Sequence, residues 1–206
     1  MALSAVRPPL LTDDPARGAP AELDRATLTR CRASDPVAFR AFVVRYQRPV
    51  FACLSRMLGV GPHVEDFAQD VFTRAFRAFP TFDLDAEAKP TTWLLTIATR
   101  VALNARARRV VPLVPIDDAK HVAHGATPET ERARVELAGL IEAAAAKLPD
   151  DQRIALVLAE YHGFTTLEIA AAMAVPEATA KTRLFRARER MRALLGDEWL
   201  ERRGGT

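Results

Sequence analysis

The sequence predicts an all-α fold of two small helical domains joined by a flexible linker, and three features indicate this. Apolar residues recur at steps of three and four through most of the chain, whereas no segment shows the alternation typical of a strand. Alanine is abundant and aromatic residues make up only 7% of the 206 residues, which favours helices. A proline-rich stretch near the middle of the chain separates two helical regions.

Composition limits the functional classes. The formal net charge is only +3, so the local clustering of charge matters more than its sum. The two cysteines, Cys31 and Cys53, have no metal-binding spacing and are expected to be small core residues in a reducing cytoplasm. Arg7, Pro8 and Pro9 interrupt any early apolar run, so we expect no signal peptide, and no run is long enough for a membrane span. The sequence therefore predicts a cytoplasmic protein.

The first helices follow a tail over residues 1–29 that is rich in proline, alanine and glycine and is predicted to be disordered, apart from a short helix near 22–31. Ser34 or Asp35 caps the next helix, and Pro36 takes its first position. Pro49 is expected to kink or restart this helix, because its ring clashes with the preceding turn. The segment GVGP at 59–62 ends it.

The helix predicted over about 64–79 has the clearest pattern in the chain. One side carries valine, alanine and phenylalanine, and the other side carries acidic and polar residues. On the pattern alone, an ordinary solvated face explains the polar side as well as a binding surface does.

A loop at 80–90 and a helix from about Thr91 to Arg109 follow. Arg100, Asn104 and Arg108 lie four residues apart, and no acid occurs between 91 and 109, which suits a DNA phosphate backbone. Trp93 could stack on a base, but a single tryptophan at the start of a helix is more often a core residue.

Residues 110–130 show no apolar period and are predicted to be the linker between domains at 30–109 and 131–200. His121 and His124 lie in this stretch without a supporting cysteine or carboxylate, so a metal site is not expected. Helices are predicted at about 129–147 and up to Tyr161, with Gly163 as a left-handed cap.

A helix-turn-helix is predicted at 165–195. A first helix runs over 166–173 with Thr165 or Thr166 as its cap, Ala174 and Val175 form the turn, and Pro176 opens the second helix. That helix has one apolar stripe, and residues 181–192 carry six basic side chains against the single acid Glu189. Such a basic second helix is typical of binding in the DNA major groove. The alternative is a solvated basic face that complements the helix dipole.

These segments resemble the two characteristic domains of bacterial extracytoplasmic-function (ECF) sigma factors. Residues 36–109 are similar to sigma region 2 through FVVRYQRPVFACLSRMLG, VEDFAQDVFTRAFRAF and TTWLLTIATRVALNARARR. Residues 133–195 are similar to sigma region 4, which contains the helix-turn-helix. The stretch between them is too short for the additional domain of a housekeeping sigma factor. Asn104, Ala174 and Ala178 depart from residues frequent in the family, and we expect them to alter promoter preference or local stability.

The resemblance implies a promoter-specificity subunit whose partners are core RNA polymerase, promoter DNA and an anti-sigma factor. It implies docking on the clamp helices of the largest polymerase subunit through Glu65, Asp66, Gln69, Asp70 and Arg74. It implies that the −10 element is unstacked and held by Phe82, Asp83, Lys89, Thr92, Arg100, Asn104 and Arg108. It implies that the −35 element is read by Pro176, Glu177, Thr179, Lys181, Thr182, Arg183 and Arg186.

Two other functions remain as alternatives. A helix-turn-helix regulator could act on DNA without being a polymerase subunit, although it would need neither the acidic face at 65–70 nor the acid-free helix. An enzyme is the weaker alternative, because the sequence contains no nucleophile–base set, glycine-rich phosphate loop or metal constellation. We therefore predict no catalytic residues, no metal and no cofactor.

Overall fold

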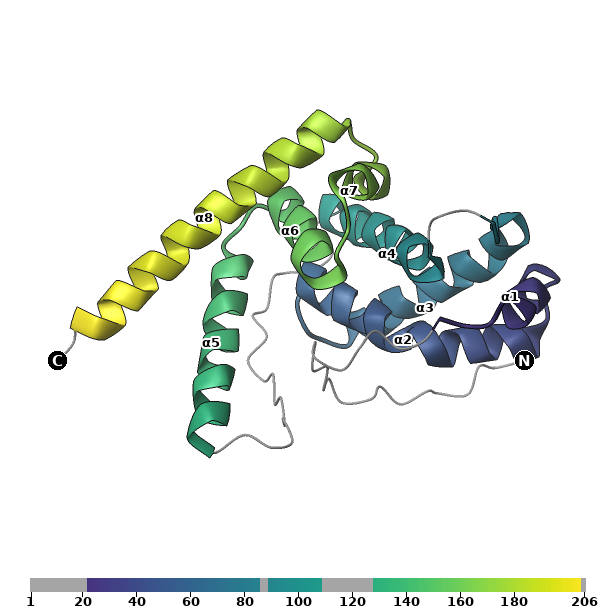
Figure 1. Cartoon of the computed structure of the whole chain (residues 1–206), viewed down its shortest axis with the longest axis horizontal. Coiled ribbons are helices and arrows are strands. Elements are labelled where there is room, and N and C mark those ends of the chain that lie inside the picture. Colours follow the sequence, from purple (N-terminus) through teal and green to yellow (C-terminus); the bar gives the residue numbers. More distant parts are fainter. Residues whose placement is uncertain (1–21, 86–88, 109–127, 205–206) are drawn as a thin grey trace.

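A computed structural model describes residues 22–85, 89–108 and 128–204 of the chain, and within these ranges every regular element is helical (Figure 1). The all-α prediction is confirmed. The N-terminal half comprises α1 (Arg25–Arg32), α2 (Pro36–Leu58), α3 (His63–Ala78), the short 3-10 helix η1 (Phe79–Thr81) and α4 (Pro90–Ala107). The C-terminal half comprises α5 (Pro128–Ala146), α6 (Asp150–His162), α7 (Thr166–Met173) and α8 (Glu177–Gly204). Most of the predicted tail and linker lies outside the described residues.

Helix α2 begins and ends where the sequence predicts. The Asp35 carboxylate accepts hydrogen bonds from the backbone N–H groups of Val37 and Ala38, and Pro36 occupies the first helical position. Pro49 was expected to kink or restart this helix, and the restart is wrong, because α2 is one helix through to Leu58. Tyr46 and Val50, on either side of Pro49, are both buried in the same core. Their burial offsets the roughly 3 kcal/mol that an interior proline costs.

An aromatic cluster joins α2, η1 and α4 at the centre of the N-terminal half. The rings of Phe42 and Phe79 meet edge to face with centroids 5.0 Å apart, and the Trp93 ring lies 5.2 Å from Phe79. Phe79 and Phe42 are fully buried, whereas Trp93 is partly buried against them. The interpretation of Trp93 as a core residue is therefore favoured over base stacking.

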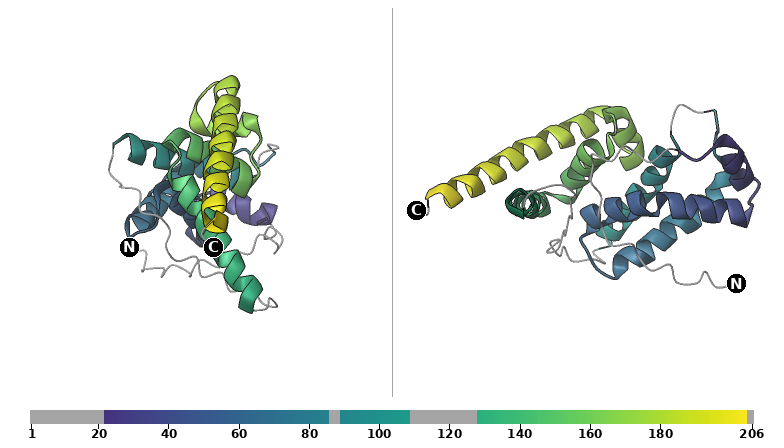
Figure 2. Two further views of the ribbon diagram at one scale, coloured as in Figure 1. Left: turned by 90° about the vertical axis from the view of Figure 1, so that its left-hand side faces the viewer. Right: turned by 60° about the horizontal axis from the view of Figure 1, so that its bottom comes forward.

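The C-terminal half follows the predicted boundaries closely, with one difference at its end. Gly163 adopts the left-handed conformation after α6 (φ 67°), as predicted. In α8 the side chains of Leu184, Ala187 and Met191 form the buried stripe that the sequence indicates. Helix α8 continues past residue 195, where the predicted helix-turn-helix ends, to Gly204, and Figures 1 and 2 show this helix extending beyond the rest of the molecule.

The two halves pack directly against each other. Helix α7 lies on α4, and α6 lies on the C-terminal part of α2 (Figures 1 and 2). At this contact the Arg56 guanidinium of α2 sits over the Tyr161 ring of α6, 4.1 Å from its centroid. His162 lies beside them, partly buried, and Nε2 of its imidazole has no hydrogen-bond partner in the described part of the chain. Burial and then the positive charge of Arg56 lower the pKa of His162 to about 4.

This depressed pKa predicts that acid destabilises the fold. Between pH 6.5 and pH 4 the unfolded chain binds a proton at His162 that the folded chain excludes. The free energy of unfolding should therefore fall with decreasing pH, by up to about 1.4 kcal/mol per pH unit from this residue. Denaturant unfolding of wild type and His162→Gln at pH 7, 6 and 5 measures it. The variant should show a shallower dependence, and equal slopes would contradict the assignment.

Candidate functional site

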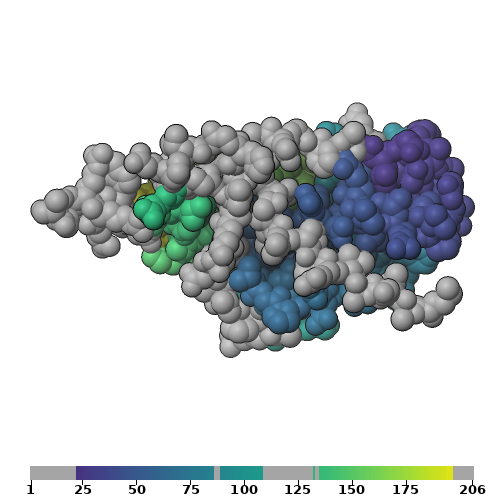
Figure 3. Space-filling view, turned by 90° about the horizontal axis from the view of Figure 1, so that it is seen from below, coloured from purple at the N-terminus to yellow at the C-terminus, as the bar shows by residue number. Residues whose placement is uncertain are grey.

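The polar face of α3 is open to solvent, on the side opposite the core. Val64, Ala68, Val71, Phe72 and Ala75 face inward. Glu65, Asp66 and Gln69 are exposed, while the partly exposed Asp70 pairs with Arg74 at 2.9 Å (Nε to Oδ1). The structure thus brings the five residues predicted to contact polymerase onto one face of one helix. Figure 3 shows helices of the N-terminal half at the surface at one end of the molecule.

The residues predicted to contact the −10 element do not form one surface. Phe82 is buried, with only 6% of its surface exposed, and its ring lies 4.8 Å from Trp93 and 5.4 Å from Phe79. It is a core residue in this structure and presents no ring to DNA, which corrects the expectation. Phe82 packs in the aromatic cluster because η1 turns the chain back towards α4.

The remaining −10 candidates lie along the solvent side of α4 and the preceding loop. Asp83 and Lys89 are exposed, and Thr92 is partly buried in the first turn of α4. Arg100, Asn104 and Arg108 are exposed at the predicted spacing of four. From Thr92 to Arg108 this row spans about 24 Å, which is several nucleotides of backbone.

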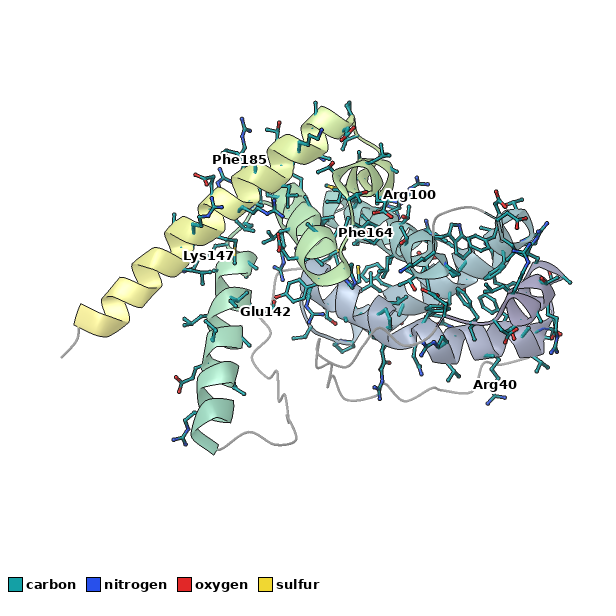
Figure 4. The ribbon with its side chains drawn as sticks, viewed as in Figure 1. Arg40, Arg100, Glu142, Lys147, Phe164 and Phe185 are labelled. Atoms are coloured by element: carbon teal, nitrogen blue, oxygen red, sulfur yellow. The ribbon has the colours of Figure 1, made fainter. Side chains whose placement is uncertain are left out.

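Arg100 is already engaged by the other half of the molecule. Its Nη2 donates a hydrogen bond of 3.3 Å to the backbone carbonyl of Ala171 in α7. Figure 4 shows the Arg100 side chain beside that helix. One predicted DNA contact is therefore covered in part by the helix-turn-helix.

Local hydrogen bonds and backbone conformations define the helix-turn-helix. Thr165 caps α7 in a capping box: its hydroxyl accepts from the backbone N–H of Glu168, and the Glu168 carboxylate accepts from the backbone N–H of Thr165. Ala174 ends α7 in the left-handed conformation at φ 53°. Pro176 precedes α8 and caps it through its carbonyl, which accepts from Thr179 and Ala180, so it stands one position earlier than predicted.

The predicted −35 residues of α8 differ in how far they are exposed to solvent. Lys181, Thr182 and Arg186 are exposed, whereas Thr179 is partly buried. Arg183 turns towards α6, where its Nε lies 2.9 Å from Asp151 Oδ2. This ion pair within the C-terminal half gives the predicted −35 residue Arg183 a partner that the sequence did not indicate.

Glu177 has structural partners that the sequence did not indicate. Its Oε1 accepts a hydrogen bond of 3.1 Å from the Thr166 hydroxyl and pairs with Lys181 Nζ at 3.0 Å. The hydrogen bond with Lys181 and then that with Thr166 lower the pKa of this carboxyl, which is charged at neutral pH. Both contacts use the same oxygen, so the second oxygen can still accept a hydrogen bond.

One exposed aromatic side chain on α8 was missed by the sequence reasoning. Phe185 is 64% exposed and follows Lys181 by one helical turn, and Figure 4 shows it on the outer side of α8. The apolar stripe through Leu184, Ala187 and Met191 accounts for the buried side of the helix. Phe185 lies outside that stripe, and this position in the sequence pattern could have predicted its exposure.

Nothing in the described ranges indicates a metal centre. Among these residues no three histidine, cysteine or acidic side chains form a metal-binding group. Cys31 and Cys53 are buried free thiols, and burial raises the pKa of Cys53 to about 12. His121 and His124 lie outside the described residues. A search of the described helices found no segment with the length and hydropathy needed to cross a bilayer.

Comparison with known proteins places both halves among related sequences. Residues 30–110 match the family Sigma-70 region 2, and residues 138–191 match the family Sigma-70, region 4. The chain is 35% identical over 177 residues to the ECF RNA polymerase sigma-E factor of Escherichia coli (strain K12), covering 81% of this chain and 91% of that protein. It is 33% identical over 178 residues to the RNA polymerase sigma-H factor of Pseudomonas aeruginosa (strain PAO1), covering 82% and 91%.

Two solved structures share the fold. CnrH, in complex with the cytosolic domain of CnrY, matches with a TM-score of 0.58 and 24% identity over 84% of this chain and 97% of that one. The sigma factor RpoE of Bartonella quintana, in complex with the anti-sigma factor NepR, matches with a TM-score of 0.54 and 23% identity over 77% and 96%.

The turn of the helix-turn-helix yields a stability prediction. An alanine in the left-handed conformation of Ala174 costs about 1–2 kcal/mol, whereas glycine adopts it freely. Glycine also loses more chain entropy on folding, by about 0.4–1 kcal/mol. Ala174→Gly should therefore raise the free energy of unfolding by up to about 1 kcal/mol in a denaturant titration. As a control, Ala178→Gly inside α8 should lower it, and a destabilised Ala174→Gly protein would contradict the prediction.

Proposed function

Because the chain belongs to the ECF group of the sigma-70 family of RNA polymerase subunits, we propose that its two halves divide promoter recognition between them. It is a sigma factor, which binds core RNA polymerase and directs transcription initiation at promoter DNA. The observation that carries the function is the pair of family matches, region 2 at residues 30–110 followed by region 4 at 138–191, in one chain. A helix-turn-helix regulator independent of polymerase would have no use for the region-2 half, so that alternative is not favoured.

Docking on core polymerase is assigned to the exposed face of α3. Three of its predicted contacts, Glu65, Asp66 and Gln69, are exposed, and Asp70 pairs with Arg74 within the same helix. A compact acidic face on a helix whose other side is buried suits a basic helical partner. Because the buried side of α3 already holds the helix in place, binding costs little conformational entropy.

Recognition of the −10 element is assigned to the loop before α4 and the solvent side of α4. Lys89, Arg100 and Arg108 supply positive charge, and Asp83, Thr92 and Asn104 supply hydrogen-bonding groups beside them. Phe82 is left out of this surface, because it is buried. The basic groups would hold the backbone of a single strand while polar groups contact unstacked bases.

Recognition of the −35 element is assigned to the first turns of α8. Lys181 and Arg186 are placed to contact phosphates or guanines, and Thr182 lies between them on the exposed side. Phe185, on the same side, adds an apolar group that fits a thymine methyl. Pro176, Thr179 and Arg183 support the helix start and its packing, with Arg183 held by Asp151.

The same proposal covers organisation, location and partners. We propose that residues 30–109 and 131–200 are separate domains joined by a linker at 110–130. A subunit of RNA polymerase acts in the cytoplasm and needs no active site of its own. An anti-sigma protein is proposed as a further partner, since the fold is shared with a sigma factor solved together with one.

A charge reversal on α3 tests the polymerase assignment. Asp66→Lys with Asp70→Lys should weaken binding to core polymerase by about 2–5 kcal/mol, because two acids at the centre of the interface become repulsive. Loss of the exposed Asp70–Arg74 pair itself costs only a few tenths of a kcal/mol of helix stability. Affinity is measured by titrating labelled protein with core enzyme, and function by transcription from a promoter library.

The matched control places the same charge change elsewhere. Asp85→Lys with Glu136→Lys reverses two exposed acids outside the α3 face and should leave polymerase affinity unchanged. Unaltered core binding by the Asp66/Asp70 variant would reject this docking face.

Base reading by Glu177 is tested against its structural contacts. If its free oxygen accepts a hydrogen bond from a cytosine amino group, Glu177→Ala should relax selectivity at one −35 position by roughly 1–3 kcal/mol. Thr166→Val is the control, because it removes the hydrogen bond to Glu177 but keeps the carboxylate. Binding to a series of −35 variants should be reordered by Glu177→Ala only. An identical ranking for wild type and Glu177→Ala would leave Glu177 a purely structural role.

A further inference from the structure

The start of α1 reaches across the N-terminal half to the chain that leads into α4. Two exposed side chains make this connection: Glu22, just before the helix, and Arg25, its first residue. Leu28 and Cys31 further along α1 are buried, so the core holds this helix in place. Contacts made by Glu22 and Arg25 therefore start from a fixed point.

Arg25 holds the chain that follows η1. Its Nη2 pairs with Asp85 Oδ1 at 2.7 Å, and its Nη1 donates a hydrogen bond of 3.3 Å to the carbonyl oxygen of Leu84. Asp83, a proposed −10 residue, belongs to the same turn, because its Oδ1 accepts a hydrogen bond of 2.9 Å from the backbone N–H of Asp85. One guanidinium thus binds two consecutive residues beside Asp83.

Glu22 holds the first turn of α4. Its Oε1 accepts a hydrogen bond of 3.2 Å from the Thr91 hydroxyl, and its Oε2 accepts one of 2.5 Å from the Tyr46 hydroxyl. Tyr46 is buried in α2, and burial and then the bond to Glu22 raise the pKa of its phenol, which stays protonated at neutral pH and donates. The carboxylate therefore connects α4 to α2 directly before Thr92, another proposed −10 residue.

These contacts lie on both sides of Lys89, the basic residue of the proposed −10 surface that precedes α4. Asp85 precedes Lys89 by four positions, and Thr91 follows it by two. Fixing the chain on both sides lowers the conformational entropy that is lost when the surface binds a single strand. The contacts of Glu22 and Arg25 therefore favour binding by preorganisation.

We propose that Glu22 and Arg25 are positioning residues for recognition of the −10 element. They hold the chain around Asp83 and Lys89, and the first turn of α4, without contacting DNA themselves. Their effect is exerted through the −10 surface proposed above, so this role rests on that assignment.

The complex of this chain with core polymerase tests the role, with a single-stranded −10 oligonucleotide taken from a promoter that the complex transcribes. Arg25→Ala should weaken binding of the oligonucleotide about two- to fivefold, because the exposed pair with Asp85 is lost. Glu22→Ala should weaken it about three- to tenfold, because two hydrogen bonds are lost. Affinity for core polymerase and for a −35 duplex should not change.

Exchanging the charged pair distinguishes positioning from direct contact with DNA. Asp85→Arg alone should weaken binding, because it sets two guanidinium groups against each other, although an added positive charge beside DNA ordinarily strengthens it. Arg25→Asp combined with Asp85→Arg should return affinity to within about twofold of wild type, because the pair is restored and its net charge is unchanged. Tighter binding by Asp85→Arg alone, or no recovery in the exchanged pair, would overturn the positioning role of Arg25.

Two variants that remove single hydroxyl groups test Glu22. Tyr46→Phe keeps the ring, which packs 4.5 Å from the Phe42 ring, and removes only the donor to Glu22. Thr91→Val keeps the shape of the side chain and removes the other donor. Each should weaken −10 binding about two- to fivefold, and neither should weaken it further in the Glu22→Ala background. Full additivity with Glu22→Ala would mean that the hydroxyl groups act independently of Glu22, and its role would be rejected.

The matched control lies in the same helix. Arg30 pairs with Asp35 at 2.7 Å, and its side chain is 58% exposed, close to the 65% of Arg25. Its partner is the cap of α2 and not the chain before α4, so Arg30→Ala should bind the oligonucleotide as wild type does. Equal weakening by Arg30→Ala and Arg25→Ala would show that the net charge of α1 governs binding, which contradicts positioning.

A variant of a proposed DNA contact separates the two possible failures. Arg108→Ala removes an exposed basic group from the proposed −10 surface. If it weakens −10 binding while Glu22→Ala and Arg25→Ala do not, the positioning role is wrong and the −10 assignment stands. If none of the three variants changes −10 binding, the −10 assignment is rejected, and the positioning role with it.

Discussion

The edge-to-face contact between Phe42 of α2 and Phe79 of η1 fixes the arrangement on which the N-terminal half depends. Phe79 directly follows α3, so this contact ties the end of α3 to α2. Trp93 then packs on Phe79 and brings the first turns of α4 into the same cluster. Aromatic pairs of this kind contribute about 0.5–1.5 kcal/mol beyond their buried area. With three helices oriented by one cluster, the acidic face of α3 and the basic row of α4 are both left on the surface.

The arrangement of the C-terminal half depends less on an aromatic cluster and more on local backbone hydrogen bonds and conformations. The capping box at Thr165, the left-handed Ala174 and the carbonyl cap from Pro176 act within a dozen residues of one another. These local contacts set the angle between α7 and α8. The buried stripe of α8 then needs only small and flexible side chains, such as Ala187 and Met191, to pack on α5–α7.

The contact between the halves combines a continuous apolar core with charged side chains at its edge. Buried ion pairs gain little net stability, since the attraction between the charges is offset by the loss of their hydration. The charged pairs Arg56–Glu142 and Arg106–Asp150 therefore contribute more to the geometry of the contact than to its stability.

The sequence by itself determined the order of the α-helices in the described ranges, the cap at Asp35, the left-handed Gly163, the helix-turn-helix and the polar face of α3. These features depend on residues four or five positions apart or closer, so the spacing of residue types along the sequence is enough to predict them. The tertiary structure decided that α2 continues through Pro49, that Phe82 is buried and that Arg183 pairs with Asp151. It also decided that Phe185 is exposed and that the halves touch. Arg153 and Arg56 are 97 positions apart, and Arg100 and Ala171 are 71 apart. Contacts over such separations leave no period in the sequence, because they depend on which surfaces the folded helices present to one another.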